Sequence, residues 1–204
     1  MRIGVGLPNV IPGASHDDLV DWARRAEDHS LTSIGALHRA SWDVHDPLDS
    51  LSLVATETAR ATLVTMVAVG PLYATEELVQ RARELHENSR NRLVLGLAVG
   101  ARVEDFEAAG VPHQGRGERF DDQLDALALT RVRSGGPPVM VGGSADVAFA
   151  RAARAGAGYV HGGGPPRAFS RAADKARAAW IEAGRPGMPE LWGQSYFTLG
   201  DEEA

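Results

Sequence analysis

Glycine-rich turns at the ends of apolar segments are the first residues in this sequence whose type and spacing suit chemistry. Gly142-Gly143-Ser144 lies between the apolar run 138–141 and a helical pattern, and Gly162-Gly163 follows the run 158–161 in the same way. Free backbone N–H groups at such a helix start attract an anion such as phosphate. The alternative is that the glycines only make tight turns. Two such turns on successive segments favour a phosphorylated cofactor.

Among the seven histidines, His38 has the position best suited to proton transfer. It follows the apolar segment 32–37, and Trp42 comes four residues later. A histidine there could donate or accept a proton beside an aromatic cofactor, or could be a loop residue bonded to a backbone carbonyl. His161 has a similar pair of interpretations, which are contact with phosphate or filling of the rim.

Several other chemistries lack their motifs. The chain has no Cys, so it has no thiolate metal ligand, Cys nucleophile or disulfide. No His-x-His or His-Glu-x-x-His spacing indicates a metal site. Neither the Gly-x-Ser-x-Gly elbow nor the phosphate-binding loop with Lys is present. Lys175 is the one lysine and lies within a helical pattern, which disfavours Schiff-base chemistry.

Composition limits the class of protein and its partners. The chain has 204 residues, of which 44% are hydrophobic and 24% charged, values that are typical of a globular protein. Its net charge is −6, and its basic residues are spread along the chain, so we expect no nucleic-acid partner. No window is apolar enough for a membrane span. The first residues predict a strand and not a signal segment, so the cytoplasm is the expected location.

Strand-like and helix-like stretches alternate along the chain and must position these residues. The strands are predicted at 2–8, 32–37, 63–69, 92–99, 138–141, 158–161 and 191–199. The helices are predicted at 15–27, 46–60, from 75, at 104–109, 116–130, 145–155 and 165–184, with Ser15, Ser144 and Asp46-Pro47 as helix starts.

Seven such units in series predict a parallel sheet covered by helices, either doubly wound or a (β/α)₈ barrel. The first strand ends Gly4-Val5-Gly6-Leu7-Pro8-Asn9, where the second Gly comes too early to open a helix as a dinucleotide fingerprint does. We therefore expect a TIM-type (β/α)₈ barrel with seven of its eight strands readable, as a single domain over residues 1–204. In either fold, ligands lie at the carboxyl ends of the strands.

The order of these segments resembles the luciferase-like monooxygenase family of flavin- or deazaflavin-dependent oxidoreductases. The resemblance is carried by residues 3–8, the helix start at 46–48, and the segments 92–100, 104–111, 116–121 and 137–144. It implies a TIM barrel that binds FMN or the deazaflavin coenzyme F-420. The cofactor-binding residues it implies are Met66 and Val67 (joined by a non-proline cis peptide), Val99, Gly100, Gly142, Gly143, Ser144, Val147, Gly162 and Gly163. His38 and Trp42 are similar to a catalytic His and Trp beside the cofactor ring.

The chain also departs from the family pattern. An acidic residue that some members carry falls near Ala101, and a phosphate-binding Arg of true luciferases falls at Val99. The segment 86–91 replaces a usual Leu-Ser-Gly-Gly turn. Members are also longer, so the domain can be interpreted as incomplete at its C-terminus or as closed by another subunit. An open barrel would leave two unpaired strand edges to cover.

The resulting functional hypothesis is a flavin- or deazaflavin-dependent oxidoreductase that acts on a small organic substrate, as a monooxygenase or a hydride-transfer dehydrogenase. The alternative is a non-catalytic or degenerate flavin-binding subunit, and a third is an unrelated phosphate-binding barrel. The resemblance also implies a homodimer formed through early helices. The residues of helix 46–60 suit such packing, but could equally face this chain's own sheet.

Overall fold

The computed structural model describes residues 2–197 and contains eight short strands and seven α-helices among them. The strands are β1 (Val5–Gly6), β2 (Ser33–Ala36), β3 (Thr62–Thr65), β4 (Ala68–Val69), β5 (Leu93–Ala98), β6 (Val139–Gly142), β7 (Gly158–His161) and β8 (Glu190–Gly193). The helices are α1 (His16–Asp28), α2 (Pro47–Ala55), α3 (Thr75–Asn88), α4 (Val103–Ala108), α5 (Arg116–Ser134), α6 (Asp146–Ala155) and α7 (Pro166–Glu182), with a 3₁₀ turn η1 (Gly70–Leu72).

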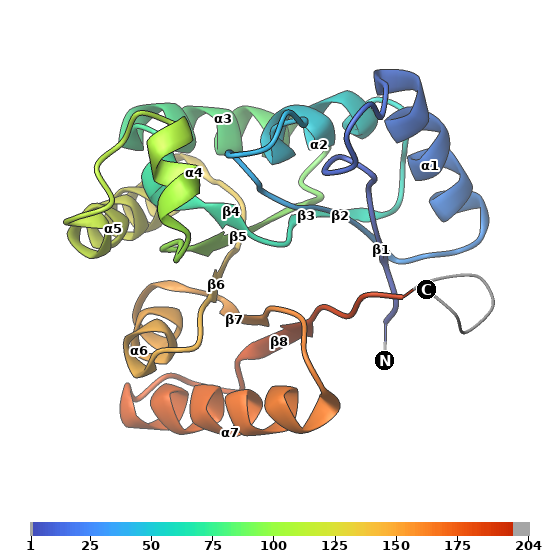
Figure 1. Ribbon diagram of the computed structural model, residues 1–204. Coiled ribbons are helices and arrows are strands. Elements are labelled where there is room, and N and C mark those ends of the chain that lie inside the picture. The colour runs from blue at the N-terminus through green and yellow to red at the C-terminus, as the bar shows by residue number, and fades with distance from the viewer. Residues whose placement is uncertain (1, 198–204) are drawn as a thin grey trace.

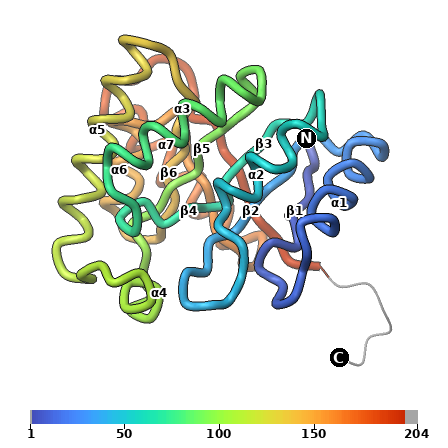
Figure 2. The backbone as a smooth tube through the Cα atoms, turned by 90° about the horizontal axis from the view of Figure 1, so that it is seen from above, coloured from blue at the N-terminus to red at the C-terminus, as the bar shows by residue number. Residues whose placement is uncertain are grey.

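The strands form a parallel sheet in the order β1-β2-β3-β5-β6-β7-β8, with β4 paired to β5 beside this path. Apart from the short β4, each neighbour along the path is also the next strand in the chain, which is the winding expected of a barrel. The helices α1, α2 and α3 lie at the top of the view in Figure 1 and α6 and α7 at the bottom, so that both sets cover the outer face of the curved sheet. Seen from above, the helices lie around the strands (Figure 2). The predicted barrel-type fold is confirmed as a parallel half-barrel.

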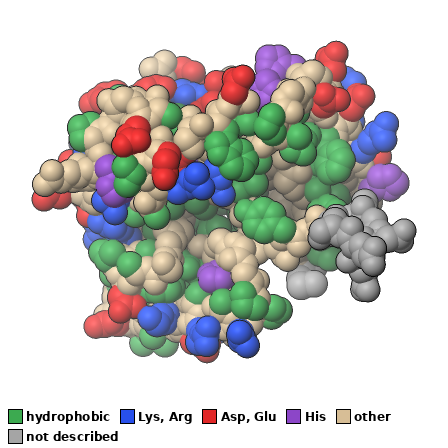
Figure 3. Space-filling model, viewed as in Figure 1, with side chains coloured by type: hydrophobic (Ala, Val, Ile, Leu, Met, Phe, Trp, Pro, Cys, Tyr) green, Lys and Arg blue, Asp and Glu red, His purple; other side chains and the backbone are tan. Residues whose placement is uncertain are grey.

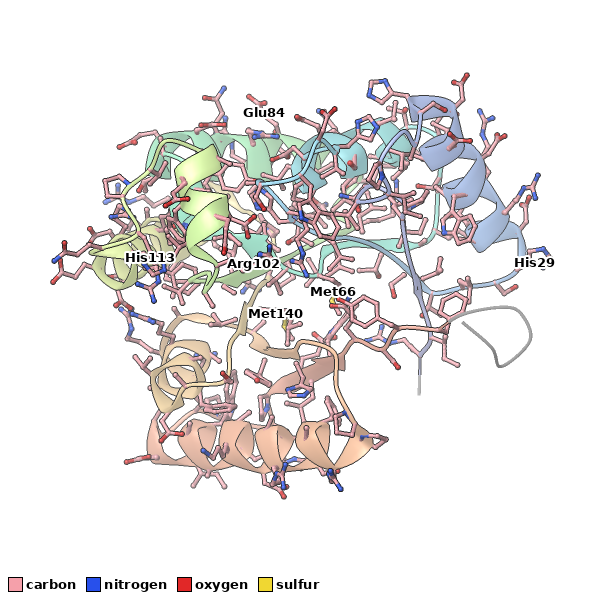
Figure 4. The ribbon with its side chains drawn as sticks, viewed as in Figure 1. His29, Met66, Glu84, Arg102, His113 and Met140 are labelled. Carbon is pink, nitrogen blue, oxygen red and sulfur yellow. The ribbon has the colours of Figure 1, made fainter. Side chains whose placement is uncertain are left out.

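Alternate side chains of the strands enter two apolar layers. Leu63, Leu95 and Val141 belong to the large core between sheet and helices. The residues beside them along the strands, such as Val64 and Met140, form a smaller cluster inside the curve of the sheet. Met66 packs against this inner cluster, and Figure 4 shows Met66 and Met140 near each other in the space that the sheet encloses.

The two ends of the sheet, β1 and β8, are not hydrogen-bonded to each other among the described residues. Near the first residues of the two strands, Arg2 forms an ion pair with Glu190 at 3.3 Å, which links the two ends of the sheet. The indole N–H of Trp22 on α1 donates to the Gly6 carbonyl at 2.9 Å and covers part of the β1 edge. Elsewhere the face shown in Figure 3 is hollowed between the parts that carry α1–α3 and α6–α7, and hydrophobic side chains lie along the hollow.

Two predicted helix starts are confirmed. Ser15 caps α1 in a reciprocal capping box with Asp18. Asp46 caps α2 and Pro47 occupies its first turn. The predicted end of α2 at residue 60 was wrong, because the carboxylate of Glu27 accepts bonds from the N–H groups of residues 59–61. Those N–H groups are therefore not available to continue the helix.

Three further boundaries differ from the prediction. The expected strand 63–69 is interrupted between β3 and β4 at Met66-Val67. Ser144 does not cap α6: Ala145 occupies the cap position without a side-chain hydrogen bond. The expected strand 191–199 is β8, which ends at Gly193, and the part of that prediction beyond residue 197 lies outside the described residues.

The apolar residues of α2 face this chain's own core. Leu48, Leu51 and Val54 are buried in the large cluster, so of the two alternatives for this helix the internal one is correct. The expected homodimer therefore gains no support from α2. Within residues 2–197, each helix is too short or too polar to cross a membrane.

Candidate functional site

His38 lies just beyond the carboxyl end of β2, with only 7% of its surface exposed. The backbone N–H of Val69, at the end of β4, donates to its Nδ1 at 3.1 Å. An atom that accepts an N–H bond carries no proton of its own, so in the neutral ring the proton sits on Nε2. No described residue hydrogen-bonds to Nε2, which leaves this nitrogen to an external partner.

The surroundings of His38 favour its neutral form. Burial lowers the pKa of His38 below its usual value; Asp46 and Asp105 oppose this shift, and the positive charges of Arg39 and Arg81 add to it. At neutral pH the ring is therefore a neutral Nε2–H donor. It can hydrogen-bond to a carbonyl or alkoxide oxygen of a bound molecule, and it can pass on the Nε2 proton.

A buried network holds one side of the His38 ring. The Tyr73 ring centroid lies 5.4 Å from that of His38. The Tyr73 hydroxyl donates to Asp46 Oδ2 at 2.6 Å, and Arg81 donates to Asp46 Oδ1 at 2.8 Å. Burial and the Asp46 charge raise the pKa of Tyr73, so its hydroxyl stays protonated. Asp46 thus joins the start of α2 to the wall of the site.

Asn9 fixes the loop that carries the site. It is fully buried at the end of β1, and its Nδ2 donates to the Leu37 carbonyl at 2.8 Å and the His45 carbonyl at 3.1 Å. Its Oδ1 accepts the Leu37 N–H at 3.1 Å. One side chain therefore holds both ends of the loop 37–45.

Asp105 on α4 fixes the middle of the same loop. It is buried, and its Oδ1 accepts both the backbone N–H of Ser41 at 3.0 Å and the Ser41 hydroxyl at 2.7 Å. Sequence reasoning missed Asn9, Tyr73 and Asp105 as site-positioning residues. The position of Asn9 at a predicted strand end was the one available signal.

The structure brings His38 and Trp42 together in a pocket of about 200 Å³. Its lining is completed by Arg39, Ala40, Val44, His45 and Asp46. Trp42 is 47% exposed, and the Arg39 guanidinium lies over its ring at 5.9 Å. The catalytic roles of His38 and Trp42 stay predictions, but both residues now face one concave site.

The peptide bond between Met66 and Val67 is cis, at the position that the family resemblance implied. Met66 lies beyond β3, where its N–H donates to the Ala36 carbonyl at 2.8 Å. A Cβ atom on Gly35 would lie 3.3 Å from Met66 Cγ, so the glycine leaves room for this side chain. Met66 and Val67 pack against the apolar cluster inside the curve of the sheet, and Val69 of β4, two residues further on, donates to His38. The contact of Met66 and Val67 with a cofactor stays a prediction.

The turn Gly142-Gly143-Ser144 links β6 to α6 as predicted. The Tyr159 hydroxyl donates to the Gly143 carbonyl at 2.6 Å and holds the turn. Because no side chain caps α6, the N–H groups of residues 146 and 147 remain available to an external acceptor, while that of Ala148 donates to the Ala145 carbonyl at 2.9 Å. Val147 is 51% exposed on that turn. Asp146 is also there, paired with Lys175 of α7 at 2.8 Å.

The second turn, Gly162-Gly163, differs from the first in its donors. Pro165 and Pro166 begin α7, and neither has a backbone N–H. Tyr196 also lies against Gly163, where an added Cβ would be 2.8 Å from its ring. The expectation that both turns offer phosphate the same helix-start donors was therefore wrong, although Gly162 and Gly163 still lie at the same end of the sheet.

Val99 and Gly100 follow β5, which pairs with β6 in the register Ala98 to Gly142. Val99 supplies no positive charge, as its sequence indicated. Arg116 at the start of α5 donates through Nε to the Gly100 carbonyl at 3.0 Å. A guanidinium thus lies beside the end of β5, next to the strand that carries the first glycine turn.

A larger pocket, of about 430 Å³, lies at the opposite end of the sheet. Its two central charged groups are paired within the chain: Glu27 accepts N–H bonds from residues 59–61, and Arg92 makes five hydrogen bonds to surrounding carbonyls and Thr58. This end stabilises the fold. Within residues 2–197, no group of three or more acidic or histidine side chains is placed to hold a metal ion.

Comparison with known proteins gives the family. The model of the luciferase-like monooxygenase family matches residues 1–131 of this chain. The chain belongs to the luciferase-like monooxygenase family. The matched part of this luciferase-like chain contains His38, Trp42, Met66-Val67 and Gly100, whereas the glycine turns on β6 and β7 lie outside it.

Curated relatives of this luciferase-like chain include an uncharacterized protein of Mycobacterium tuberculosis and one of Mycobacterium bovis. Each is 32% identical over 122 residues, which are 50% of this chain and 42% of the relative. The chain therefore spans less than half the length of these relatives in the alignment.

Solved structures share the luciferase-like fold over nearly the whole chain. A monooxygenase of Streptomyces bottropensis has a TM-score of 0.79 at 19% identity, covering 95% of this chain and 70% of that one. A coenzyme F-420 dependent tetrahydromethanopterin reductase of Methanopyrus kandleri has 0.77 at 14%, covering 96% and 66%. The FMN complex of the oxygenating constituent of 3,6-diketocamphane monooxygenase from Pseudomonas putida has 0.79 at 17%, covering 92% and 65%.

Proposed function

We propose that this chain is an oxidoreductase that binds reduced FMN or the deazaflavin coenzyme F-420 at the carboxyl ends of its strands and acts on a small organic substrate. One observation carries the proposal: His38 is buried, the Val69 N–H holds its Nδ1, and the ring lines a pocket in which Nε2 has no partner among the described residues. An enzyme in complex with FMN and an alcohol dehydrogenase in complex with an F-420 adduct share this fold.

The residues present fit such a cofactor. Gly143, at φ 141°, and the uncapped start of α6 leave backbone N–H groups for a phosphate, and the partly buried Met66 and Val67 offer an apolar surface for a ring. When bound, the cofactor supplies hydride transfer or, as reduced flavin, reaction with oxygen. The chain's own residues orient it, exclude water at this apolar surface and provide the Nε2 proton of His38.

The first experiment is an equilibrium titration of the purified protein with FMN and with coenzyme F-420, each oxidised and reduced. Ser144→Asp places negative charge at the start of α6 and should weaken binding at least ten-fold. Ser52→Asp, on the exposed side of α2, adds the same charge far from the site and should change nothing. Equal affinities of the two variants for the cofactor would remove this phosphate site.

Turnover is tested separately from binding. His38→Ala should abolish turnover and leave cofactor affinity within about three-fold, because Nε2 acts on the substrate and not on the phosphate. His29→Ala is the control, since His29 is exposed at the end of α1 (Figure 4). Unchanged turnover of His38→Ala would remove His38 from the mechanism.

The second candidate function is a non-catalytic flavin-binding subunit. It is favoured by Val99 and Ala101, which provide neither of the charged residues that the resemblance implied at these positions. Tight cofactor binding without turnover on any class of substrate tested would support this role.

A further inference from the structure

Arg39 is a half-buried cation without an anionic partner. It lines the pocket that holds His38 and Trp42, and its described polar contact is the donation from Nη1 to the His38 carbonyl at 2.9 Å. Among residues 2–197 it forms no ion pair with Asp or Glu. Its guanidinium lies over the Trp42 ring and so has a fixed place at the pocket wall.

The acidic groups around the pocket are already in use. Both oxygens of Asp46 are occupied, one by Tyr73 and the other by Arg81 and the start of α2. Asp105 is held by Ser41 and lies 3.6 Å from Arg102. Asp43 is exposed and does not line the pocket. The chain therefore supplies no counter-ion to Arg39.

Two other arginines of this chain use their guanidinium groups fully within the chain, whereas Arg119 and Arg185, like Arg39, are part-buried and form no ion pair among the described residues. Arg92 makes five hydrogen bonds at the opposite end of the sheet, and Arg151 makes a two-bond pair with Asp121. Arg39 is only half-buried, and its Nε and Nη2 have no partner among the described residues and are open to solvent in the pocket. An external anion can therefore reach these N–H groups, which distinguishes Arg39 from Arg92 and Arg151.

We infer that this pocket binds the carboxylate group of the substrate, an inference that rests on the proposed function and adds to it the substrate class. The planar fork of Arg39 matches a carboxylate. The neutral Nε2–H of His38 provides a second donor, and Trp42 provides an apolar face for a ring or short chain attached to the carboxylate. A pocket of about 200 Å³ suits a small organic acid.

The test uses flavin-free protein and the probe pair benzoate and benzamide, which have similar shapes but differ in charge. Binding is followed at constant ionic strength by NMR shifts of the Arg39 Nε–H and His38 ring signals. Arg39→Gln removes the charge, and Arg39→Lys keeps the charge but not the fork. Arg133→Gln is the matched control, since Arg133 is exposed on α5 and has no polar contact among the described residues.

Benzoate should shift both signals saturably and bind at least ten-fold more tightly than benzamide. Arg39→Gln should weaken benzoate at least ten-fold, Arg39→Lys less, and Arg133→Gln not at all. Equal affinity for the two probes, or unchanged affinity in Arg39→Gln with Arg39→Lys also unchanged, would overturn the inference. Circular dichroism shows whether each variant is folded. If Arg39→Gln is unfolded, the benzoate affinity of Arg39→Lys is the test of the inference.

Because the probes need no flavin, the two proposals can fail separately. If benzoate binds but neither FMN nor F-420 does, the proposed carboxylate site is supported and the proposed oxidoreductase function is contradicted. Cofactor binding without benzoate binding would remove only the proposed carboxylate site. In an enzyme with turnover, Arg39→Gln should raise KM for carboxylate-bearing substrates and leave kcat within a few-fold.

Discussion

Replacing Asn9 by Asp tests whether one buried amide holds the loop of the site. Asn9 has no exposed surface, and its Nδ2 faces the carbonyl oxygens of Leu37 and His45 at 2.8 and 3.1 Å. Asn9→Asp keeps the shape but puts an oxygen against these two oxygens. The variant can then restore one hydrogen bond only by protonating the introduced carboxyl.

The expected cost at pH 7 follows from that protonation. Protonating a carboxylate whose ordinary pKa is about 3.9 costs about 4 kcal/mol at pH 7, because each pH unit above the pKa costs about 1.4 kcal/mol. The second lost hydrogen bond adds about 1 kcal/mol. We therefore expect the free energy of unfolding to fall by about 5 kcal/mol at pH 7 and by about 1–2 kcal/mol near pH 4.

The sign of the pH dependence is specific to this reasoning. The introduced carboxyl has a raised pKa in the folded state. The stability of Asn9→Asp relative to the wild type is therefore greatest at low pH and falls as the pH rises. Urea unfolding from pH 4 to 7, followed by circular dichroism and compared with the wild type at each pH, measures it. Asn88→Asp, at an exposed position, should cost at most about 0.5 kcal/mol. A deficit of Asn9→Asp that stays constant from pH 4 to 7 would refute the argument.

Three further substitutions test other contacts. Glu27→Gln should lower the free energy of unfolding by about 2 kcal/mol at pH 7. Burial raises the pKa of Glu27, but three backbone N–H donors outweigh burial, so the pKa in the folded state is lowered. In urea unfolding, the difference in stability between the variant and the wild type should therefore vanish as the pH falls below about 4. Gly143→Ala should lower the free energy of unfolding by at least about 1 kcal/mol, because φ is 141° and the added Cβ would lie 2.8 Å from a side chain of α6. Gly162→Ala has open space around the added Cβ and should lower it by less than about 0.5 kcal/mol, and thermal unfolding of both variants measures the difference. Tyr73→Phe should cost about 1–2 kcal/mol by losing its bond to the Asp46 carboxylate, and an unchanged melting temperature would contradict that contact.

The order of the elements could be predicted because it rests on local signals. Alternating apolar segments and two local caps, Ser15 and Asp46, predicted the parallel arrangement and two helix starts. Polar groups and glycines at strand ends predicted that His38 and the turn at Gly143 would lie at one end of the sheet, whereas the cis bond at Met66-Val67 was implied only by the family resemblance. The positions of His38 and Gly143 follow from parallel strands, whose carboxyl ends must share an edge.

The remaining features depend on contacts between distant parts of the chain. Asn9 acts on a residue 28 positions away, Asp105 on one 64 away, and Glu27 on one 34 away. No pattern within a helix or strand marks such residues. Ser144 illustrates the opposite error: its residue type suits a cap, but the helix begins after Ala145, so its hydroxyl does not reach the first-turn N–H groups.

The two ends of the sheet differ in how their central polar groups are paired, although His86 Nδ1 near the amino end is also buried without a partner. At the amino end, Glu27 and Arg92 have each of their hydrogen-bonding atoms engaged with the chain. At the carboxyl end, His38 Nε2, Arg39 Nε and Nη2, and the N–H groups of residues 146 and 147 have no partner among the described residues. These donors remain open to solvent at the end of the sheet where ligands of parallel α/β proteins lie. That placement is the basis for the two proposals, phosphate at the start of α6 and an organic acid at Arg39.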